Sequence, residues 1–248
     1  MRILRCGRTA ALAALIALGW QAPASAIVGG VEASTAEYPW LAAVGTPLLL
    51  NRPSGQFCGG ALIAPDQVIT AAHCVAPARP LAQTLTVTFG RDDLRGLGGN
   101  TVQVKDIRTH PGFRSNGPDS AAVYQNDVAI LTLDQPQPGP TVGIAAPGPG
   151  TATILGWGAT SATDEGNTRL HAASVPLVAD AECAAAYGSA FDPSTMLCAG
   201  SPAADTARYD GGGPLLVDGR LAGLTSWDEG AARPGFPKVY TRITGVAF

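Results

Sequence analysis

Short runs of β-branched and apolar residues recur along the chain, separated by glycine, proline and polar turn residues. Hydrophobic periodicity is short throughout, as is typical of strands that pair in an antiparallel barrel or sandwich. We therefore predict strands at 41–44, 61–70, 85–89, 102–107, 128–133, 153–157, 172–178, 215–224 and 238–243.

One segment interrupts this pattern near the middle of the chain. The sequence PQPGPTVGIAAPGPG at 136–150 is dense in proline and glycine, and it predicts a connection between two halves. The one helical candidate is an alanine-rich piece at 179–188, for which Gly188 could form the C-cap. No internal repeat and no long run of charge is found. The pattern therefore predicts an all-β protein built from two halves.

The beginning of the chain has the parts of a secretion signal. Arginines precede an apolar run at 9–20, and the small residues ASA at 24–26 provide a signal-peptidase site. The apolar run is too short to span a membrane. We predict that residues 1–26 are a signal peptide removed by cleavage after Ala26, and that the secreted domain spans 27–248.

The net charge of the chain limits the kinds of partner that we expect. Removal of the signal takes away Arg2, Arg5 and Arg8 but no acid, so the formal net charge moves from −3 to −6. Charged residues are 14% of the chain, against about 25% in an average globular protein. A mildly acidic chain with two lysines binds polyanions poorly, so we expect neither nucleic acid nor an anionic membrane as a partner. We expect a monomer.

Cysteine usage agrees with export. Cys6 lies within the predicted signal, which leaves an even set of four cysteines in the domain. An even set in an exported chain predicts two disulfides. No cluster of cysteine and histidine has the spacing of a metal site, so we expect no metal and no cofactor. The four cysteines of the domain are Cys58, Cys74, Cys183 and Cys198.

Four stretches carry a family resemblance. They are IVGG at 27–30, TAAHC at 70–74, NDVAIL at 126–131, and YDGGGP at 209–214 followed by TSW at 225–227. In this order they resemble the trypsin-like serine peptidases of the chymotrypsin fold (peptidase family S1), including the secreted bacterial trypsins. The resemblance covers nearly all of residues 27–243. It implies two antiparallel six-stranded β-barrels with an active site in the cleft between them.

The resemblance assigns roles to individual residues. His73 in TAAHC matches the general base, and Asp127 in NDVAIL matches the buried carboxylate that fixes the histidine tautomer. A structural histidine beside a disulfide and a turn aspartate are the alternatives, and the surrounding motifs favour the triad roles. Ser226, Trp227 and Asp228 match the segment that pairs with the substrate backbone, where Ser226 would also lie near Asp127.

The chain departs from the family at the nucleophile. The family has G-D-S-G-G-P where this chain has YDGGGP, so the position of the reactive serine is Gly211. A glycine has no side chain and forms no acyl-enzyme. Tyr209 replaces the glycine whose N–H, together with that of residue 211, forms the oxyanion hole. We expect a tyrosine there to turn or strain the peptide.

Further substitutions fall in the family's primary specificity pocket. Asp205 matches the pocket-floor aspartate that would select arginine or lysine, whereas Lys238 and Asp228 replace two glycines that line the pocket. One hypothesis is that Lys238 reaches Asp205 or Asp228 and fills the pocket. The other is that Lys238 points outward into solvent.

The resemblance also implies an activation pair and the disulfide pairing. In the family, the amino group of the new N-terminus, here Ile27, inserts beside the aspartate that precedes the nucleophile, here Asp210. Members usually end in a helix on the second barrel. Because this chain stops at Phe248, we expect that helix to be absent or the sequence to be truncated. The implied bridges are Cys58 with Cys74 and Cys183 with Cys198, and alanines replace a third bridge at Ala207 and Ala231.

Three functions are consistent with these residues. The first is a secreted trypsin-fold protein without peptidase activity, a pseudoprotease that acts by binding a polypeptide substrate or protein ligand. The second is a working serine endopeptidase, a hydrolase that cleaves after arginine or lysine in proteolysis and relies on water activated by His73. The third is the product of a decaying gene. The changes at Gly211, Tyr209, Lys238 and Asp228 favour the first.

Overall fold

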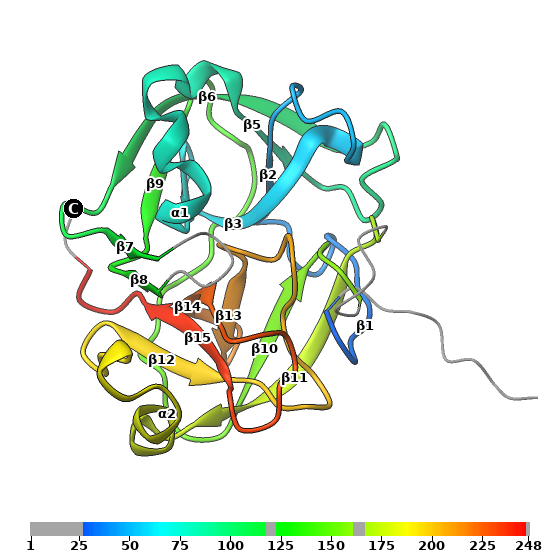
Figure 1. Cartoon of the computed structure of the whole chain (residues 1–248). Coiled ribbons are helices and arrows are strands. Elements are labelled where there is room, and N and C mark those ends of the chain that lie inside the picture. Colours follow the sequence, from blue (N-terminus) through cyan, green and yellow to red (C-terminus); the bar gives the residue numbers. More distant parts are fainter. Residues whose placement is uncertain (1–26, 118–122, 161–166, 247–248) are drawn as a thin grey trace, which may run out of the picture.

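Two β-barrels lie side by side in the protein, as Figure 1 shows. The structure is a computed structural model, and it describes residues 27–117, 123–160 and 167–246. The predicted signal peptide at 1–26 lies outside the described residues. The proline- and glycine-rich stretch at 136–150 connects the two barrels, as its composition predicts.

The first barrel is closed, antiparallel and six-stranded. Its strand order is β2-β3-β4-β9-β6-β5, and alternate side chains such as Val68, Val87 and Val104 fill its core. The strands are β2 (Leu41–Gly45), β3 (Gln56–Ala64), β4 (Gln67–Thr70), β5 (Thr86–Phe89), β6 (Asn100–Thr109) and β9 (Ala129–Leu133).

The second barrel is a sheet in the order β11-β10-β13-β14-β15-β12, which the pairing of β11 with β12 closes. A short strand near the start of the domain, β1 (Val31–Glu32), pairs with the outer edge of β11. The barrel strands are β10 (Thr151–Gly156), β11 (His171–Val178), β12 (Met196–Ala199), β13 (Pro214–Val217), β14 (Arg220–Trp227) and β15 (Lys238–Arg242).

The remaining elements are small. A two-stranded ribbon of β7 (Arg114–Asn116) and β8 (Val123–Gln125) lies beside the junction of the barrels. The described α-helices are α1 (Ala72–Val75) and α2 (Asp180–Tyr187), and 3-10 helices lie at Pro53–Gly55, Ala76–Thr84 and Gly188–Ala190. No helix of the described residues is long and apolar enough to cross a membrane. Within the described residues, no helix follows β15.

The two-barrel prediction is confirmed, but several boundaries are wrong. The runs at 61–70 and 215–224 each cover parts of two strands joined by a tight turn, and β12 was not predicted. The helix at 179–188 is confirmed, with Gly188 at its C-terminus at a φ of 56°. Helix α1 was missed because it is a single turn, too short to show periodicity.

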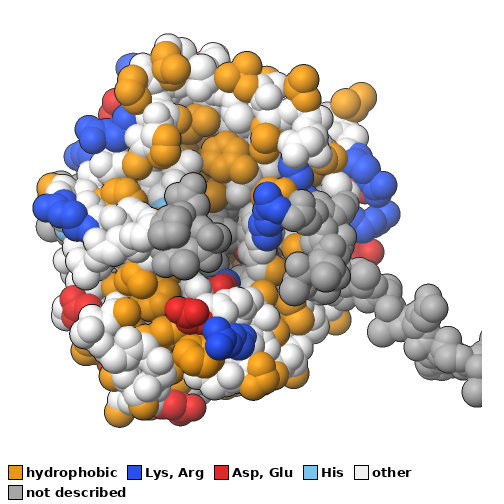
Figure 2. Space-filling view, viewed as in Figure 1, with side chains coloured by type: hydrophobic (Ala, Val, Ile, Leu, Met, Phe, Trp, Pro, Cys, Tyr) orange, Lys and Arg blue, Asp and Glu red, His pale blue; other side chains and the backbone are white. Residues whose placement is uncertain are grey.

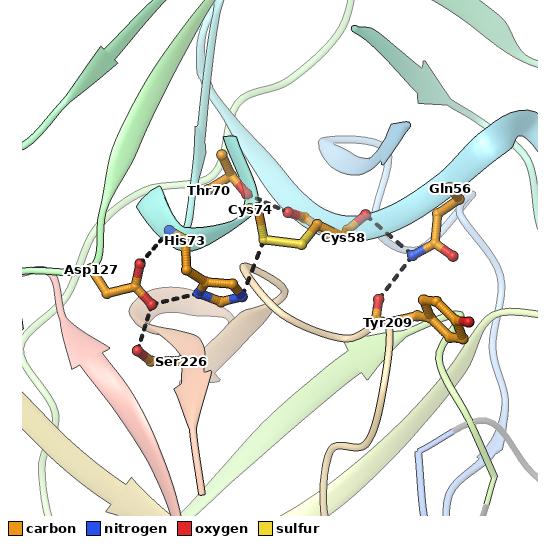
Figure 3. The surroundings of a disulfide bond; sticks show 9 residues. Gln56, Cys58, Thr70, His73, Cys74, Asp127, Tyr209 and Ser226 are labelled. Carbon is orange, nitrogen blue, oxygen red and sulfur yellow. Dashed lines mark hydrogen bonds and ion pairs between the residues drawn. A yellow bond between two sulfur atoms is a disulfide. The ribbon is translucent and has the colours of Figure 1, made fainter. Parts of the chain in front are cut away.

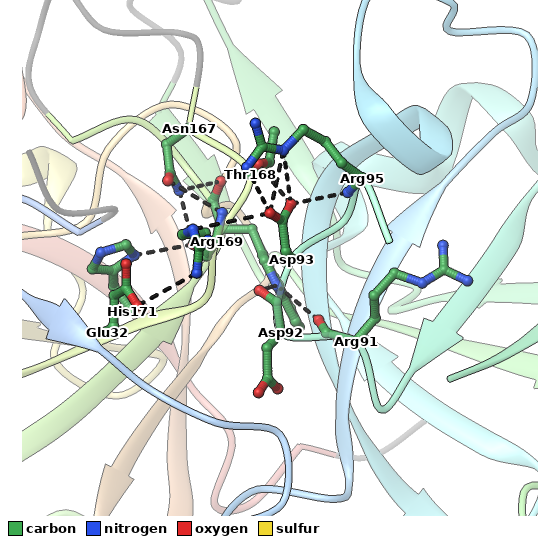
Figure 4. A network of polar contacts seen from close by, with 10 residues as sticks. Glu32, Arg91, Asp92, Asp93, Arg95, Asn167, Thr168, Arg169 and His171 are labelled. Carbon is green, nitrogen blue, oxygen red and sulfur yellow. Dashed lines mark hydrogen bonds and ion pairs between the residues drawn. The ribbon is translucent and has the colours of Figure 1, made fainter. Parts of the chain in front are cut away.

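A polar network fastens the two barrels together (Figure 4). Asp93 follows β5, forms an ion pair with Arg95 at 2.7 Å and accepts a hydrogen bond from the Thr168 hydroxyl at 2.9 Å. The bonds from Arg95 hold the pKa of Asp93 well below its usual range. Next to Thr168, the Asn167 amide donates to the carbonyl of Gly158 at 3.1 Å. The network therefore ties a loop of the first barrel to the segment that supports the candidate active site.

Candidate active site

His73 and Asp127 meet in the first barrel, on the side that faces the second (Figure 3). The α1 turn carries His73, and Asp127 precedes β9. One Asp127 oxygen accepts the His73 backbone N–H at 2.8 Å, and the other lies 2.7 Å from Nδ1. Asp127 is fully buried, so these bonds replace the water that its charge has lost. With Asp127 ionised, Nδ1 carries the proton and Nε2 keeps its lone pair.

Two further side chains hold this pair. The Ser226 hydroxyl, on β14 of the second barrel, donates to Asp127 at 2.6 Å. The ring of Tyr124 stacks on the imidazole, with centroids 4.7 Å apart and planes 9° from parallel. The histidine is therefore fixed in both tautomer and orientation, which is the arrangement a general base requires.

Gly211 lies directly against the imidazole. A Cβ built on this glycine would be 2.7 Å from His73 Nε2 and 3.4 Å from Cys58 Sγ. The first distance is shorter than carbon and nitrogen tolerate without a shift, so the ring occupies space that a side chain at 211 would need. The Gly211 carbonyl accepts the N–H of Gly59 in β3 at 2.8 Å, which docks this loop on the first barrel.

Tyr209 adopts a backbone conformation that favours glycine. Its φ is 75°, in the left-handed region. Gln56 donates to its carbonyl at 2.9 Å, and the guanidinium groups of Arg52 and Arg208 lie over its ring at 4.0 and 4.9 Å from the centroid. Cation–π contacts of this kind are worth about 0.5 to 2 kcal/mol each. The strain that we expected is present, and these contacts oppose it.

Asp210 is a fully buried acid whose two oxygens accept the backbone N–H groups of Gly158 and Ala207 at 2.8 and 2.9 Å. Burial raises the pKa of Asp210 to about 7. Ile27, the predicted new N-terminus, is fully buried in the core of the second barrel. An ammonium group in this region would find a buried carboxylate to stabilise it.

The candidate pocket residues lie together in the second barrel. Lys238 begins β15, is 5% exposed, and its ammonium contacts the carboxylate of Asp228, just after β14. Asp205 is 1% exposed, and its oxygens accept the N–H groups of Thr206 and Ala232 at 2.8 Å each. Lys238 thus points inward, contrary to the hypothesis that it faces solvent.

Trp227 is also buried, at 5% exposure. Its neighbour Tyr187 meets it edge-on, with centroids 4.9 Å apart. The substrate-pairing role that the resemblance gives Trp227 therefore depends on its backbone, at the end of β14, more than on its ring.

Both predicted disulfides are confirmed. Cys58 pairs with Cys74 behind the histidine, and Cys183 pairs with Cys198 in the second barrel. Cys58, His73 and Cys74 also lie close enough together to suggest metal ligands. Because disulfide sulfurs are not thiolates, this group offers a metal little beyond one imidazole.

Three residues that sequence reasoning missed shape this site. Tyr124 covers one face of His73, and Arg52 and Gln56 hold Tyr209. Tyr124 lies three residues before Asp127, so the neighbouring NDVAIL motif could have drawn attention to it. Arg52 and Gln56 carry no local signal, since their partner is far away in the chain.

Comparison with known proteins agrees with the geometry. The Trypsin family model matches residues 27–247. A trypsin of Saccharopolyspora erythraea is 39% identical over 88% of this chain and 93% of its own length. A trypsin-like protease of Streptomyces glaucescens is 34% identical over 89% of this chain and 80% of its own, and trypsin eta of Drosophila erecta is 32% identical over 89% and 87%. With two closed barrels and a His73–Asp127 pair at their junction, the chain belongs to the trypsin family.

Proposed function

We propose that this chain is a secreted member of the trypsin family that has lost peptidase activity and binds polypeptides in the cleft between its barrels. The observation that carries the proposal is Gly211. The residue that faces the Nε2 lone pair of His73 has no side chain, and a Cβ built there would be only 2.7 Å from Nε2.

Acyl transfer in this family's manner needs a hydroxyl that the histidine can deprotonate. The polar contact of Nε2 within the described residues is the disulfide sulfur of Cys74 at 3.4 Å. The Ser226 hydroxyl donates to Asp127, on the Nδ1 side of the ring. The His73–Asp127 pair is therefore a base without a nucleophile.

The alternative is a working endopeptidase in which His73 activates water. Loss of the nucleophile from such a triad leaves about 10³- to 10⁴-fold acceleration over uncatalysed hydrolysis, supplied by oxyanion and binding groups. Tyr209 strains one of the oxyanion positions, which argues that even this residual rate is reduced. The alternative therefore predicts at most very slow cleavage.

A polypeptide is the ligand class that this cleft suits best. The family resemblance implies that the backbone at Ser226 and Trp227, at the end of β14, pairs with an extended chain. On the face in Figure 2, the lysines and arginines that are visible lie in separate groups, with acids among them. Secretion is supported by the two disulfides, because such bonds persist in oxidising compartments.

The test is to incubate the protein beginning at Ile27 with a fluorophosphonate probe and with arginine-containing peptides, beside an active trypsin as the positive control. We expect no labelled protein and peptides that remain intact by mass spectrometry. A dye-labelled unfolded casein should nevertheless bind, measured by fluorescence polarisation. Probe labelling of the unaltered chain, or cleavage that a His73→Ala variant abolishes, would contradict the proposal.

A further inference from the structure

Lys238 is an unusual residue in this protein because it is a buried cation. The chain has two lysines, and the other, Lys105 on β6, is exposed. Lys238 is 5% exposed, and it begins β15, which lies between β14 and β12 in the second barrel. A buried ammonium is strongly unfavourable without an anion beside it.

The anions are present. The ammonium of Lys238 contacts Asp228, whose other oxygen accepts the N–H of Gly230 at 2.6 Å. Asp205 and Asp210 are buried nearby, and their charges favour the protonated lysine, whereas burial lowers the pKa of Lys238. Within the described residues, Asp205 has no ion pair with an arginine or lysine at 4.0 Å or less. Lys238 is therefore the cation whose charge offsets that of these acids.

We propose that Lys238 is a built-in occupant of the space beside Asp205 and Asp228, from which it excludes the cationic side chains of a ligand. The inference rests on the proposed function in one respect, since it assumes that a polypeptide lies in the cleft.

The physical argument has two parts. The lysine side chain fills volume that an incoming arginine or lysine would need, and its ammonium repels a second cation at short range in a poorly hydrated space. The ion pair with Asp228 also removes one of the charges that would attract such a cation. A pocket gains specificity when an unfavourable charge contact weakens the binding of one class of ligand.

The experiment uses benzamidine, a planar cation, and isothermal titration of the protein beginning at Ile27. We expect no binding to the unaltered chain at 10 mM. Lys238→Gly should bind benzamidine at least 100-fold more tightly, and so should Lys238→Gly with Asp228→Gly, which also removes the carboxylate that loses its ion pair and keeps the test available if the single variant folds poorly. Adding Asp205→Asn to either should abolish the gain. Lys105→Ser is the matched control and should resemble the unaltered chain.

Binding to the unaltered chain within tenfold of the opened variants would overturn the proposal, as would folded variants that do not bind. A second measurement needs no variant. When the native protein is acetylated and digested for mass spectrometry, Lys105 should react at least 10-fold faster than Lys238, and equal rates would overturn the proposal. Neither readout depends on hydrolysis, so failure here is distinct from the discovery of peptidase activity.

Discussion

The two barrels contribute very different halves to the cleft. The first supplies His73 and Asp127, with bonds of 2.7 to 2.8 Å between them, in the arrangement of a competent general base. The second supplies Gly211 without a side chain, Tyr209 in a strained conformation, and a lysine that reaches Asp228. The half on the first barrel is thus ordered although the nucleophile position on the second has no side chain, and contacts such as that of Ser226 with Asp127 and that of Gln56 with Tyr209 join the two halves across the junction.

The largest effect should come from rebuilding the second half. We expect Gly211→Ser alone to hydrolyse peptides poorly, because its Cβ would meet the His73 ring at 2.7 Å and Tyr209 would remain strained. Adding Tyr209→Gly, Lys238→Gly and Asp228→Gly should raise kcat/KM for an arginine amide at least 10³-fold above the natural chain. His73→Ala should then remove that gain. Full activity from Gly211→Ser alone would show that both halves are intact apart from the serine.

The disulfides should stabilise both barrels alike. Each closes a loop with a sequence separation of 16 or 15 residues, which corresponds to about 3 kcal/mol in the chain-entropy model. We expect Cys58→Ala with Cys74→Ala, and Cys183→Ala with Cys198→Ala, to lower the free energy of unfolding by similar amounts, measured in urea. A much smaller loss for the variant without Cys183 and Cys198 would mean that the second barrel gains less stability from its disulfide than the first barrel does.

The buried acid beside Gly211 should make stability depend on pH. The pKa of Asp210 is raised to about 7 by burial, whereas an unfolded aspartate titrates near 3.9. The folded state therefore holds its proton more tightly, and stability falls as the pH rises through 7. In a form with two residues added before Ile27, we expect a loss of roughly 2 to 3 kcal/mol between pH 5 and 8.

Two controls identify the group. Asp210→Asn should flatten the profile, because the amide does not titrate. A form that begins at Ile27 should also show a flatter profile if its free ammonium reaches Asp210, as the family resemblance implies. Identical pH profiles of thermal unfolding in the extended form and in Asp210→Asn would exclude Asp210 as the source.

The smallest effect concerns Tyr209. Tyr209→Ala keeps a side chain at a φ of 75° but removes the ring beneath Arg52 and Arg208, whereas Tyr209→Gly removes both the ring and the strain. We expect the glycine variant to be more stable than the alanine variant by about 1 kcal/mol, measured by urea unfolding. The reverse order would mean that the backbone is unstrained in solution.

Much of the fold could be predicted from local sequence. Short apolar runs predicted an antiparallel β protein in two halves, and the even cysteine count predicted two disulfides. The two six-stranded barrels and the cysteine pairing came from the family resemblance carried by motifs such as TAAHC and NDVAIL, and the structure confirms both. The predicted strand boundaries are wrong at hairpins such as that between β3 and β4, because an uninterrupted apolar run does not reveal a tight turn.

The candidate site likewise has features that the sequence determined and features that only the tertiary structure decided. The sequence by itself determined that residue 211 has no nucleophile, because the absence of a side chain is a property of one residue. Tertiary structure decided that Lys238 turns inward to Asp228, and that Gln56 holds the carbonyl of Tyr209, 153 residues away. Such contacts depend on how two barrels bring distant segments together, and burial then requires every charge to find its partner.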